Sequence, residues 1–580
     1  MFARRKSVIL REMCVVKKMI STIIFLVLIL TIPFVTVSQA FQLPEFLRVG
    51  LYFGDNARTN IGVSSPDGLW LGYYEGLNFT PVWRADNGNV IIRKDTHFAT
   101  SASGINGIAE TSANARWGPY HVQYFSNIEL YDAPALIEYL QSYDINAYLA
   151  VIGLSYHIWG GTHVSSQAAY AAAAQSPVSA TVASVSDRRI NVMCADSMET
   201  IMVFGHMTLG LGVRPIPDDI ENQRFNIHTA HETPLNYRGG LDFIRLDGGN
   251  LTVTNVVHLE HYLYHVVPRE MPATWHIEAL KAQAVAARNF AVTAGDRHRD
   301  QPFDLCNGVH CQVYLGTTPE IESAVRAVNE TRGRVLLFNG VPARVFYSSS
   351  FGGPSDYVQN VWMTPIPYLV PVSNHYEDTE NINNGVWSGT LTIAQATERM
   401  NARGHGVGTV TNIEVLEYTP AGNVLRLRVT GTSGYRIYER EQARIAFGSV
   451  TLSQRFAVAR GGTEPSILRV PNLDGGGTAE IVPFYAVNGM GEVKNMLLQS
   501  VYIMTENGLQ TYVQQTQTAN SEYIVTIVAE GPDPNVFYFS GRGWGNPVGM
   551  SQFGARGMAE AGYTYYQILM HFMPGTSLSE

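Results

Sequence analysis

Short runs in which apolar and polar residues alternate dominate the chain after residue 40. Such runs occupy Leu47–Phe53, Leu69–Tyr74 and Asn89–Arg93, and Gly, Asn and Asp residues separate them. Alternation with a period of two is typical of strands that bury one face. The pattern predicts a β-rich region over residues 41–117, and similar runs between Pro-rich turns predict its continuation over residues 188–227.

The segment between these two regions, residues 118–187, has a different pattern. Tyr120–Phe125 alternates as a strand, Ala133–Tyr143 has helical spacing, two strands follow about Gly153, and Ser165–Ala174 is an Ala-rich helix that begins with serine. With a last strand at 181–185, the predicted order is βαββαβ, which is that of a small split βαβ module. We therefore expect this module to be inserted within one β-rich unit.

From residue 228 onward the pattern mixes helical and strand periods. Val256–Val267 is apolar on one helical face, and Pro268-Arg-Glu-Met-Pro272 then predicts a break in the chain. A second helix should follow, and its many alanines imply close packing against a neighbour. The apolar stripe of that helix consists of Ile277, Leu280, Ala284, Ala287 and Ala291.

A Gly-rich stretch at 460–478 predicts a loop, and residues 482–528 predict more strands. The whole pattern predicts an α+β, multidomain chain. Its parts are the β-rich N-terminal regions, the small ferredoxin-like module, and a mixed β-rich domain over residues 228–580 that contains the packed helix.

Composition narrows the class of protein. The chain has 580 residues, and its 46% hydrophobic and 11% aromatic content excludes wholesale disorder. The first 40 residues carry six basic residues and one acidic residue, so without them the formal charge falls from −9 to −14. A chain this acidic is not expected to bind nucleic acid through bulk charge.

The N-terminal segment has the features of an export signal. A basic region, Arg4 to Lys18, precedes the apolar run Ile20–Val37, and Ser38-Gln-Ala40 offers a cleavage site of small residues. The run is nearly long enough to span a bilayer, so residues 1–40 are either a signal peptide or an uncleaved anchor. In both cases the rest of the chain is expected to act at the cell wall outside the cytoplasm, either secreted or anchored in the membrane.

The four cysteines do not form a disulfide framework, because Cys14 lies in the signal region and Cys194 is isolated. Cys306 and Cys311, with His310 between them and His298 upstream, offer a Cys₂His₂ set that suits a structural zinc ion. His298 is the least certain ligand by spacing. A disulfide between the two cysteines and an inert turn are the alternatives.

Glu270 is the candidate catalytic residue. It lies in the Pro-bracketed segment before the second helix, where a carboxylate would be held rigidly. A charge that interacts with the helix dipole, or a salt bridge to Arg269 or Lys281, would explain the same position.

Four collinear motifs bear on this choice. They are Leu259-Glu-His-Tyr-Leu-Tyr-His-Val-Val-Pro-Arg-Glu-Met-Pro-Ala-Thr-Trp275, Glu278-Ala-Leu-Lys-Ala-Gln-Ala-Val-Ala-Ala-Arg288, Tyr347-Ser-Ser-Ser-Phe-Gly-Gly353 and Gly541-Arg-Gly-Trp-Gly-Asn-Pro-Val-Gly-Met-Ser-Gln-Phe-Gly-Ala555. They closely resemble the stage II sporulation protein D (SpoIID/LytB) family, over roughly 228–456 and 537–576. The resemblance implies a lytic transglycosylase of bacterial peptidoglycan, with Glu270 as its single acid and base.

The resemblance also implies further site residues. Hydroxyl and backbone groups are expected to line a sugar cleft, with Trp544 stacked on a pyranose ring. For the serine motif, a strand that runs into a glycine turn is the alternative. The family usually has Gly-His-Gly where this chain has Gly545-Asn-Pro547, so the role of that histidine is lost or passes to Asn546. His261 and His265, at i and i+4, imitate a metal pair but are expected to be surface or packing residues. The expected lining residues are Ser348, Ser349, Ser350, Gly352, Gly353, Trp544, Ser551 and Gln552.

The inserted module resembles the SPOR domain, which binds glycan strands without peptide stems. Tyr120, Tyr156 and Trp159 are then expected to be exposed glycan contacts; a ferredoxin-like module without this function is the alternative. The expected partners are glycan strands and, in the rival interpretation, a cell-wall amidase that the chain enhances without catalysis. A zinc hydrolase that acts through Cys306, His310 and Cys311 is a third interpretation.

Overall fold

The fold is described from a computed structural model of the chain. It describes residues 41–461 and 533–579, apart from 102–103, 108–111, 113, 218, 230–233, 296, 317–319 and 363, together with short strands between 466 and 527. The expected signal peptide or anchor, residues 1–40, lies outside the described residues. Among the helices that are described, none combines the length and apolar character needed to cross a bilayer.

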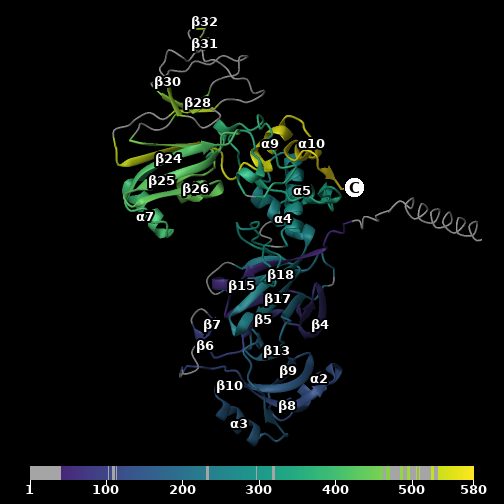
Figure 1. The fold of residues 1–580 in the computed structure, drawn as a ribbon. Helices are drawn as coiled ribbons and strands as arrows, with labels where there is room; N and C mark the ends of the chain where they lie inside the picture. The colour runs from purple at the N-terminus through teal and green to yellow at the C-terminus, as the bar shows by residue number, and fades with distance from the viewer. Residues whose placement is uncertain are drawn as a thin grey trace, which may run out of the picture. The chain divides into compact units, whose positions relative to one another are not determined.

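Two large sheets confirm the α+β class (Figure 1). The seven-stranded sheet has the order β19-β1-β18-β17-β14-β3-β4. The predicted alternation of buried residues holds only in part, because Val49 to Tyr52 are all buried. The last strand of this sheet, β19, pairs in parallel with β1 and places Cys306 opposite Gly50. The strands are β1 (Phe46–Tyr52), β3 (Leu69–Glu75), β4 (Asn78–Ala85), β14 (Leu211–Pro215), β17 (Gly240–Arg245), β18 (Leu251–His258) and β19 (Leu305–Cys306).

The ten-stranded sheet contains the inserted module. Its order is β11-β8-β10-β9-β13-β12-β5-β2-β15-β16, so the first four strands have the antiparallel 4-1-3-2 arrangement of a ferredoxin-like unit. β5 and β12 are neighbours and lie on either side of the inserted segment in sequence. The strands are β2 (Asn60–Ser64), β5 (Asn89–Lys94), β8 (Tyr120–Ile128), β9 (Ala147–Ile152), β10 (Ser155–His163), β11 (Thr181–Val182), β12 (Ile190–Cys194), β13 (Thr200–Gly205), β15 (Arg224–His228) and β16 (Leu235–Arg238).

The two helices of the module form where the sequence predicts them. They are α2 (Ala133–Gln141) and α3 (Ser166–Gln175). Ser165 caps α3, because its hydroxyl accepts a hydrogen bond from the Ala168 amide at 3.2 Å. The module does not end in a free edge at β9, since β9 pairs in parallel with β13 over four residues.

The helices that carry the site differ from the prediction in their boundaries. β18 continues to His258, so α4 is Leu259–Glu270 and not Val256–Val267, and it runs through Pro268 to Glu270. α5 (Ile277–Thr293) is buried on nearly all sides and contacts α4, α6 (Glu322–Glu330), α9 (Gln552–Glu560) and α10 (Tyr565–Phe572). The C-terminal motif therefore packs on the same helix as the motif of Glu270.

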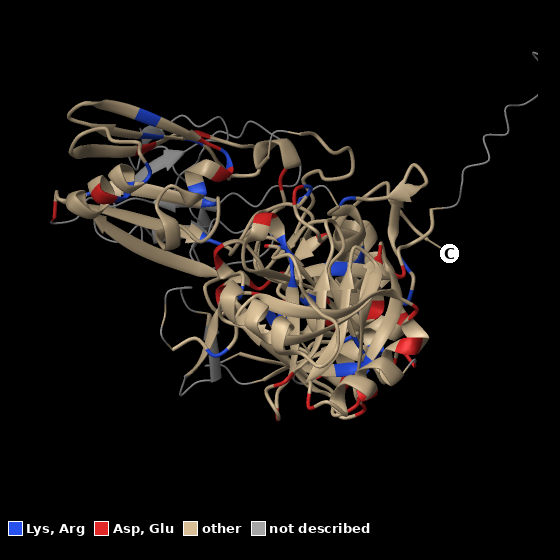
Figure 2. Cartoon of the chain, turned by 90° about the horizontal axis from the view of Figure 1, so that it is seen from below, with Lys and Arg blue, Asp and Glu red and all other residues tan. Residues whose placement is uncertain are grey.

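Residues 386–460 form a part with its own hydrophobic core, which the sequence did not predict. β34 (Val536–Arg542) returns to it and pairs with both β23 (Val386–Thr392) and β27 (Phe456–Arg460). Lys and Arg are interspersed with Asp and Glu along the described ribbon (Figure 2). Within 482–528 short strands are described, as predicted, at Phe484–Val487, Val493–Met496 and Ile524–Ile527, whereas the predicted Gly-rich loop lies mostly outside the described residues. The remaining elements of this part are α7 (Ile393–Ala402), β24 (Val410–Tyr418), β25 (Val424–Gly431), β26 (Gly434–Glu439) and α8 (Glu441–Ile445).

Candidate functional site

Glu270 is the last residue of α4, not a residue of a turn before the next helix. The Met271 amide caps α4 by donating to the Val267 carbonyl at 2.9 Å. The C-terminal end of a helix carries partial negative charge, which disfavours an ionised carboxylate. This position therefore favours the protonated form of Glu270.

The carboxyl group of Glu270 lies in a partly enclosed, mostly neutral environment. Burial raises its pKa above the usual value, and hydrogen bonds from the Gln552 and Tyr347 side chains and the Val313 amide oppose that rise. The Gln552 amide nitrogen lies 3.4 Å from the carboxyl oxygen. The net shift is upward, so desolvation outweighs the hydrogen bonds.

A buried set of neutral polar side chains supports these contacts. The Gln312 amide donates to the Tyr347 hydroxyl at 2.7 Å, and the Tyr262 hydroxyl donates to Gln312 at 3.0 Å. Gln283, fully buried on α5, lies against both Tyr347 and Gln552. These side chains are neutral, so they place no charge beside the Glu270 carboxyl.

Two other carboxylates near α4 and α5 are already occupied. Glu260 is 3% exposed and accepts two hydrogen bonds from the guanidinium of the fully buried Arg288. Glu278 pairs with Lys281 at 2.8 Å and accepts from the Tyr565 amide at 2.7 Å. Lys281 therefore pairs with Glu278 and not with Glu270.

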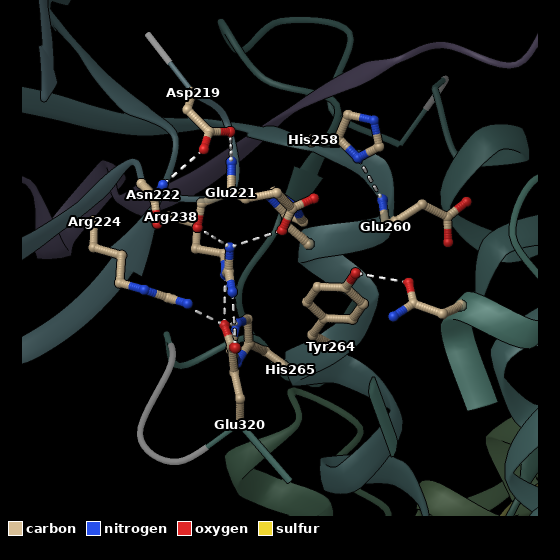
Figure 3. Close-up of polar contacts among 12 residues, drawn as sticks. Asp219, Glu221, Asn222, Arg224, Arg238, His258, Glu260, Tyr264, His265 and Glu320 are labelled. Atoms are coloured by element: carbon tan, nitrogen blue, oxygen red, sulfur yellow. Dashed lines mark hydrogen bonds and ion pairs between the residues drawn. The ribbon is translucent and has the colours of Figure 1, made fainter. Parts of the chain in front are cut away.

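The two histidines of α4 are packing residues, as expected. His261 lies 3.1 Å from Glu221, and His265 lies 3.5 Å from Glu320. Figure 3 shows that Arg238 donates two hydrogen bonds to Glu320 and Arg224 donates a third, with His265 beside them. These charged contacts fix α4 to the strands β15 and β16 and leave no role for the histidines as a metal pair.

The serine motif and the C-terminal motif meet beside Glu270. β22 (Tyr347–Ser348) pairs in parallel with β35 (Met550–Ser551), and the amides and carbonyls of Ser350 and Trp544 exchange hydrogen bonds at 2.7 and 3.1 Å. Gly545, at φ +104°, lies so close to Ser348 that a Cβ there would meet the serine Cβ at 2.6 Å. The two motifs thus form one surface that continues to Tyr347 and Glu270.

Only some of the expected lining residues are available to a ligand. Trp544 is 46% exposed, and Ser348 and Ser349 are partly exposed. Gln552 is mostly buried, but its amide reaches Glu270. These four residues remain candidates for contact with a substrate.

The other four expected lining residues are engaged within the chain. Ser350 and Ser551 are fully buried, and both hydroxyls donate to Glu377. Gly352, at φ +65°, is required because a Cβ there would lie 2.4 Å from the Arg542 carbonyl carbon. A Cβ on Gly353 would lie 2.8 Å from the Arg455 guanidinium. The expected contact with sugar is wrong for Ser350, Ser551 and Gly352, which are buried, whereas the partly exposed Gly353 stays a prediction.

Asn546, which stands where the family usually has histidine, is engaged by α8 and the serine motif. In the amide orientation that satisfies its neighbours, its nitrogen donates to the Glu441 carboxylate at 2.6 Å. Its backbone carbonyl accepts from the Ser348 hydroxyl at 2.7 Å. Asn546 therefore links the C-terminal motif to α8.

Cys306, His310, Cys311 and His298 come together as one cluster. One donor atom from each lies within 4.8 Å of all the others. The distances are 3.3 Å from His298 Nε2 to Cys311 Sγ, 3.5 Å from His310 Nδ1 to Cys311 Sγ, and 3.7 Å from His310 Nδ1 to Cys306 Sγ. A tetrahedral zinc site has sulfur–nitrogen edges of about 3.6 Å, so the donor set fits zinc. The two thiols are free, without a disulfide between them.

The cluster is joined directly to the surroundings of Glu270. Cys306 is held at the sheet edge by β1, and Cys311 is followed by Gln312 and Val313, which contact Tyr347 and Glu270. A metal ion bound here would hold the segment 306–313 in place. Its effect on the site would be positional, because the ligands contact Glu270 only through these two residues.

The aromatic residues expected on the inserted module do not form one exposed face. Trp159 is 4% exposed, stacked on His121 at 5.4 Å and covered by the Arg189 guanidinium at 5.3 Å. Tyr156 packs against the large core, whereas Trp159 belongs to a separate small core. Tyr120 is partly exposed, with its ring 6.3 Å from that of His97. The expected exposure of Trp159 is wrong, because the insertion lets neighbouring loops cover this face.

Sequence reasoning missed several residues of the site. Tyr347 and Gln283 lie within motifs that assign them no role, and Gln312 and Glu377 lie outside the four motifs. A buried glutamine in an Ala-rich helix is a weak signal for Gln283. Glu377 follows a polar loop without periodicity, so no pattern in the sequence indicates it.

Comparisons with known proteins bear on the same segments. Residues 247–338, which contain α4, α5 and the cysteine cluster, match the family model described as "Stage II sporulation protein". The chain is 28% identical over 318 residues to the "Amidase enhancer" of Bacillus subtilis (strain 168), covering 54% of this chain and 40% of that protein. It is 33% identical over 143 residues to the "Stage II sporulation protein D" of the same organism, covering 22% of this chain and 41% of that protein. The chain thus spans less than half the length of these relatives.

Proposed function

We propose that this chain is a lytic transglycosylase of peptidoglycan, because residues 247–338 match the family model described as "Stage II sporulation protein". The bond cleaved lies between N-acetylmuramic acid and N-acetylglucosamine, and Glu270 is the catalytic residue. The proposed setting is the cell wall outside the cytoplasm, in remodelling connected with sporulation. Glycan strands, preferably without stem peptides, are the proposed substrate.

One observation carries this proposal: the carboxyl of Glu270 stands among neutral hydrogen-bond donors, with its pKa raised by burial. Hydrolysis of glycosides normally uses two carboxyl groups, one as acid and one as base or nucleophile. Here Glu260 and Glu278 are engaged by Arg288 and Lys281. A single carboxyl suits a reaction that needs no attacking water.

Glu270 would act twice in this reaction. Protonated, it donates its proton to the bridging oxygen as the glycosidic bond breaks, and the sugar alcohol leaves. The resulting carboxylate then takes the proton of the muramic acid C6 hydroxyl, whose oxygen bonds to C1 and closes a 1,6-anhydro ring. The proton ends on Glu270 again, so the carboxyl is restored. Gln552 and Tyr347 would stabilise the intermediate carboxylate by donating to it.

We also propose that Cys306, His310, Cys311 and His298 hold a structural zinc ion. The thiolate and imidazole donors lie at separations that suit a tetrahedral site. When bound, the ion would restrain the segment that leads to Gln312 and Val313. No residue of the cluster takes part in the reaction itself.

The test of the enzyme is product analysis. Purified protein incubated with peptide-free glycan strands should release 1,6-anhydro-muramyl products. Glu270→Gln keeps the shape of the side chain but cannot exchange a proton at neutral pH, so kcat should fall at least about a hundredfold. Glycan binding should be retained. A fall of only a few-fold in a folded variant would mean that another group is the acid.

A second function is favoured by the likeness to a protein named amidase enhancer and by Asn546, which is turned toward Glu441. In it the chain binds the wall and enhances an amidase without cleaving glycan. Absence of anhydro products at several pH values, together with faster release of stem peptides by an added cell-wall amidase, would support this function over the first.

A further inference from the structure

One buried carboxylate joins the serine motif, the C-terminal motif and the loop between residues 374 and 379. Glu377 is 6% exposed, and each of its two carboxyl oxygens accepts three hydrogen bonds. The first oxygen accepts from Ser350, the Gly352 amide and Thr379 at 2.6, 2.8 and 3.1 Å. The second accepts from the Phe351 amide, Asn374 and Ser551.

Ser551 connects this carboxylate to the residues around Glu270. Its hydroxyl donates to Glu377 and accepts from the Gly554 amide at 3.0 Å, so it also caps α9. Gln552, the first residue of α9, places its amide 3.4 Å from Glu270. On the other side, Ser350 follows the strand that begins with Tyr347. Both side chains that contact Glu270 therefore lie within three residues of a hydroxyl that Glu377 holds.

The buried Arg455 binds the carbonyl groups of residues 350–354, whereas Glu377 binds amide groups of the same segment. The Arg455 guanidinium donates to the carbonyls of Phe351 and Pro354, at 3.3 and 3.0 Å. Glu377 binds the loop through its N–H groups and Arg455 binds it through its C=O groups. With both present, the buried backbone of residues 350–354 has partners on each side.

We propose that Glu377 is a positioning residue for the reaction: it holds the serine motif and the start of α9 together, so that Tyr347 and Gln552 meet Glu270. The inference rests on the proposed function, since it assigns Glu377 a task only if Glu270 performs the chemistry. Glu377 does not contact the substrate. A carboxylate suits this task because it only accepts hydrogen bonds, and all six of its partners donate.

The test compares Glu377→Gln with Glu398→Gln, which removes the same charge from an exposed residue of α7. In Glu377→Gln an NH₂ group faces donors, so hydrogen exchange of the Phe351 and Gly352 amides should be at least about tenfold faster. The control should exchange as the unaltered chain does. Glu377→Asp keeps the charge on a shorter side chain, so its exchange rates should be intermediate. It replaces Glu377→Gln in the test if that variant does not fold. Unchanged exchange in a folded variant would overturn the proposal.

The pH profile of kcat distinguishes the proposed positioning role from a purely structural role, because a purely structural role would leave the profile unchanged. Gln552 and Tyr347 lower the pKa of Glu270 by donating to its carboxylate, so loss of their alignment should raise that pKa. Since the protonated acid is the active form, the alkaline limb of the profile should move to higher pH in Glu377→Gln, and kcat should fall about tenfold or more. Faster exchange with an unmoved limb would overturn the positioning role. Failure of the proposed function itself would appear separately, as turnover in Glu270→Gln or none in the unaltered chain.

Discussion

The buried histidines of α4 should make the stability of the chain depend on pH. Burial lowers the pKa of His261 to about 4, despite the opposing carboxylate of Glu221. The unfolded chain binds a proton at this residue below about pH 6.5, whereas the folded chain does not until about pH 4. The free energy of unfolding should therefore fall on acidification through this window, by an amount on the order of 1–3 kcal/mol for this residue.

Thermal unfolding of His261→Gln at pH values from 7.5 to 4.5 checks this expectation. The variant should lose less stability on acidification than the unaltered chain. The melting temperature of the variant should still fall somewhat on acidification, because burial also lowers the pKa of His265. His375→Gln, at an exposed position, serves as the control. Parallel pH dependence in both variants would contradict the prediction.

The sequence indicated Glu270 through the motif that surrounds it, but not the groups that act on it. Gln552 is 282 residues away, and Tyr347 and Val313 come from other segments. Ser350 and Ser551 were mistaken for substrate ligands because polar residues beside a site are assumed to face it. Their hydroxyls instead satisfy the buried Glu377, which only the folded arrangement brings to them.

At the scale of the element, the segment 306–313 connects the proposed zinc site to Glu270. Chelation should therefore affect both stability and catalysis. Removing a structural zinc ion leaves thiol and imidazole groups without their shared partner, and such sites contribute directly to folding. We expect the melting temperature to fall on treatment with EDTA, and activity on soluble glycan to fall with it.

Stoichiometric zinc should restore both properties, and Cys311→Ser should behave like the chelated protein. Measured metal content of about one zinc per chain would support the site. Cys194→Ser, a change at a cysteine outside the cluster, should retain zinc and activity. A chain without bound zinc whose melting temperature does not respond to EDTA would leave the cluster without a metal role.

Element types were predicted better than their ends. Val256 and Val257 suit both a strand and the apolar face of a helix, and the pairing of β18 with β1 and β17 decides for the strand. Pro268 was expected to end α4, but the helix continues two residues beyond it. The separate core of residues 386–460 was missed because its strands join distant segments, such as β23 and β34.

At the scale of the whole molecule, the inserted module is part of the larger sheet. β9 pairs with β13, and the buried Asp95 lies 2.9 Å from both His121 of the module and Arg189 beyond it. Deleting residues 118–187 would remove β9 and His121 together. The edge of β13 would become unpaired, and exposed edge strands promote association. The sequence predicted the order of elements in the module but not this integration, because pairing between β9 and β13 leaves no local pattern.

The deletion should therefore lower stability and not only remove a glycan-binding unit. We expect the shortened chain to melt several degrees lower and to form larger species by size-exclusion chromatography, because an unpaired edge accompanies the loss of the buried contact between His121 and Asp95. Asp95→Asn in the full chain separates the two causes: it weakens the buried contacts of Asp95 with His121 and Arg189 but keeps β9 on β13, so it should melt lower and elute like the unaltered chain. If the shortened chain stays monomeric with an unchanged melting temperature, the module is an independent unit. Its loss of binding to peptide-free sacculi would then report glycan recognition directly.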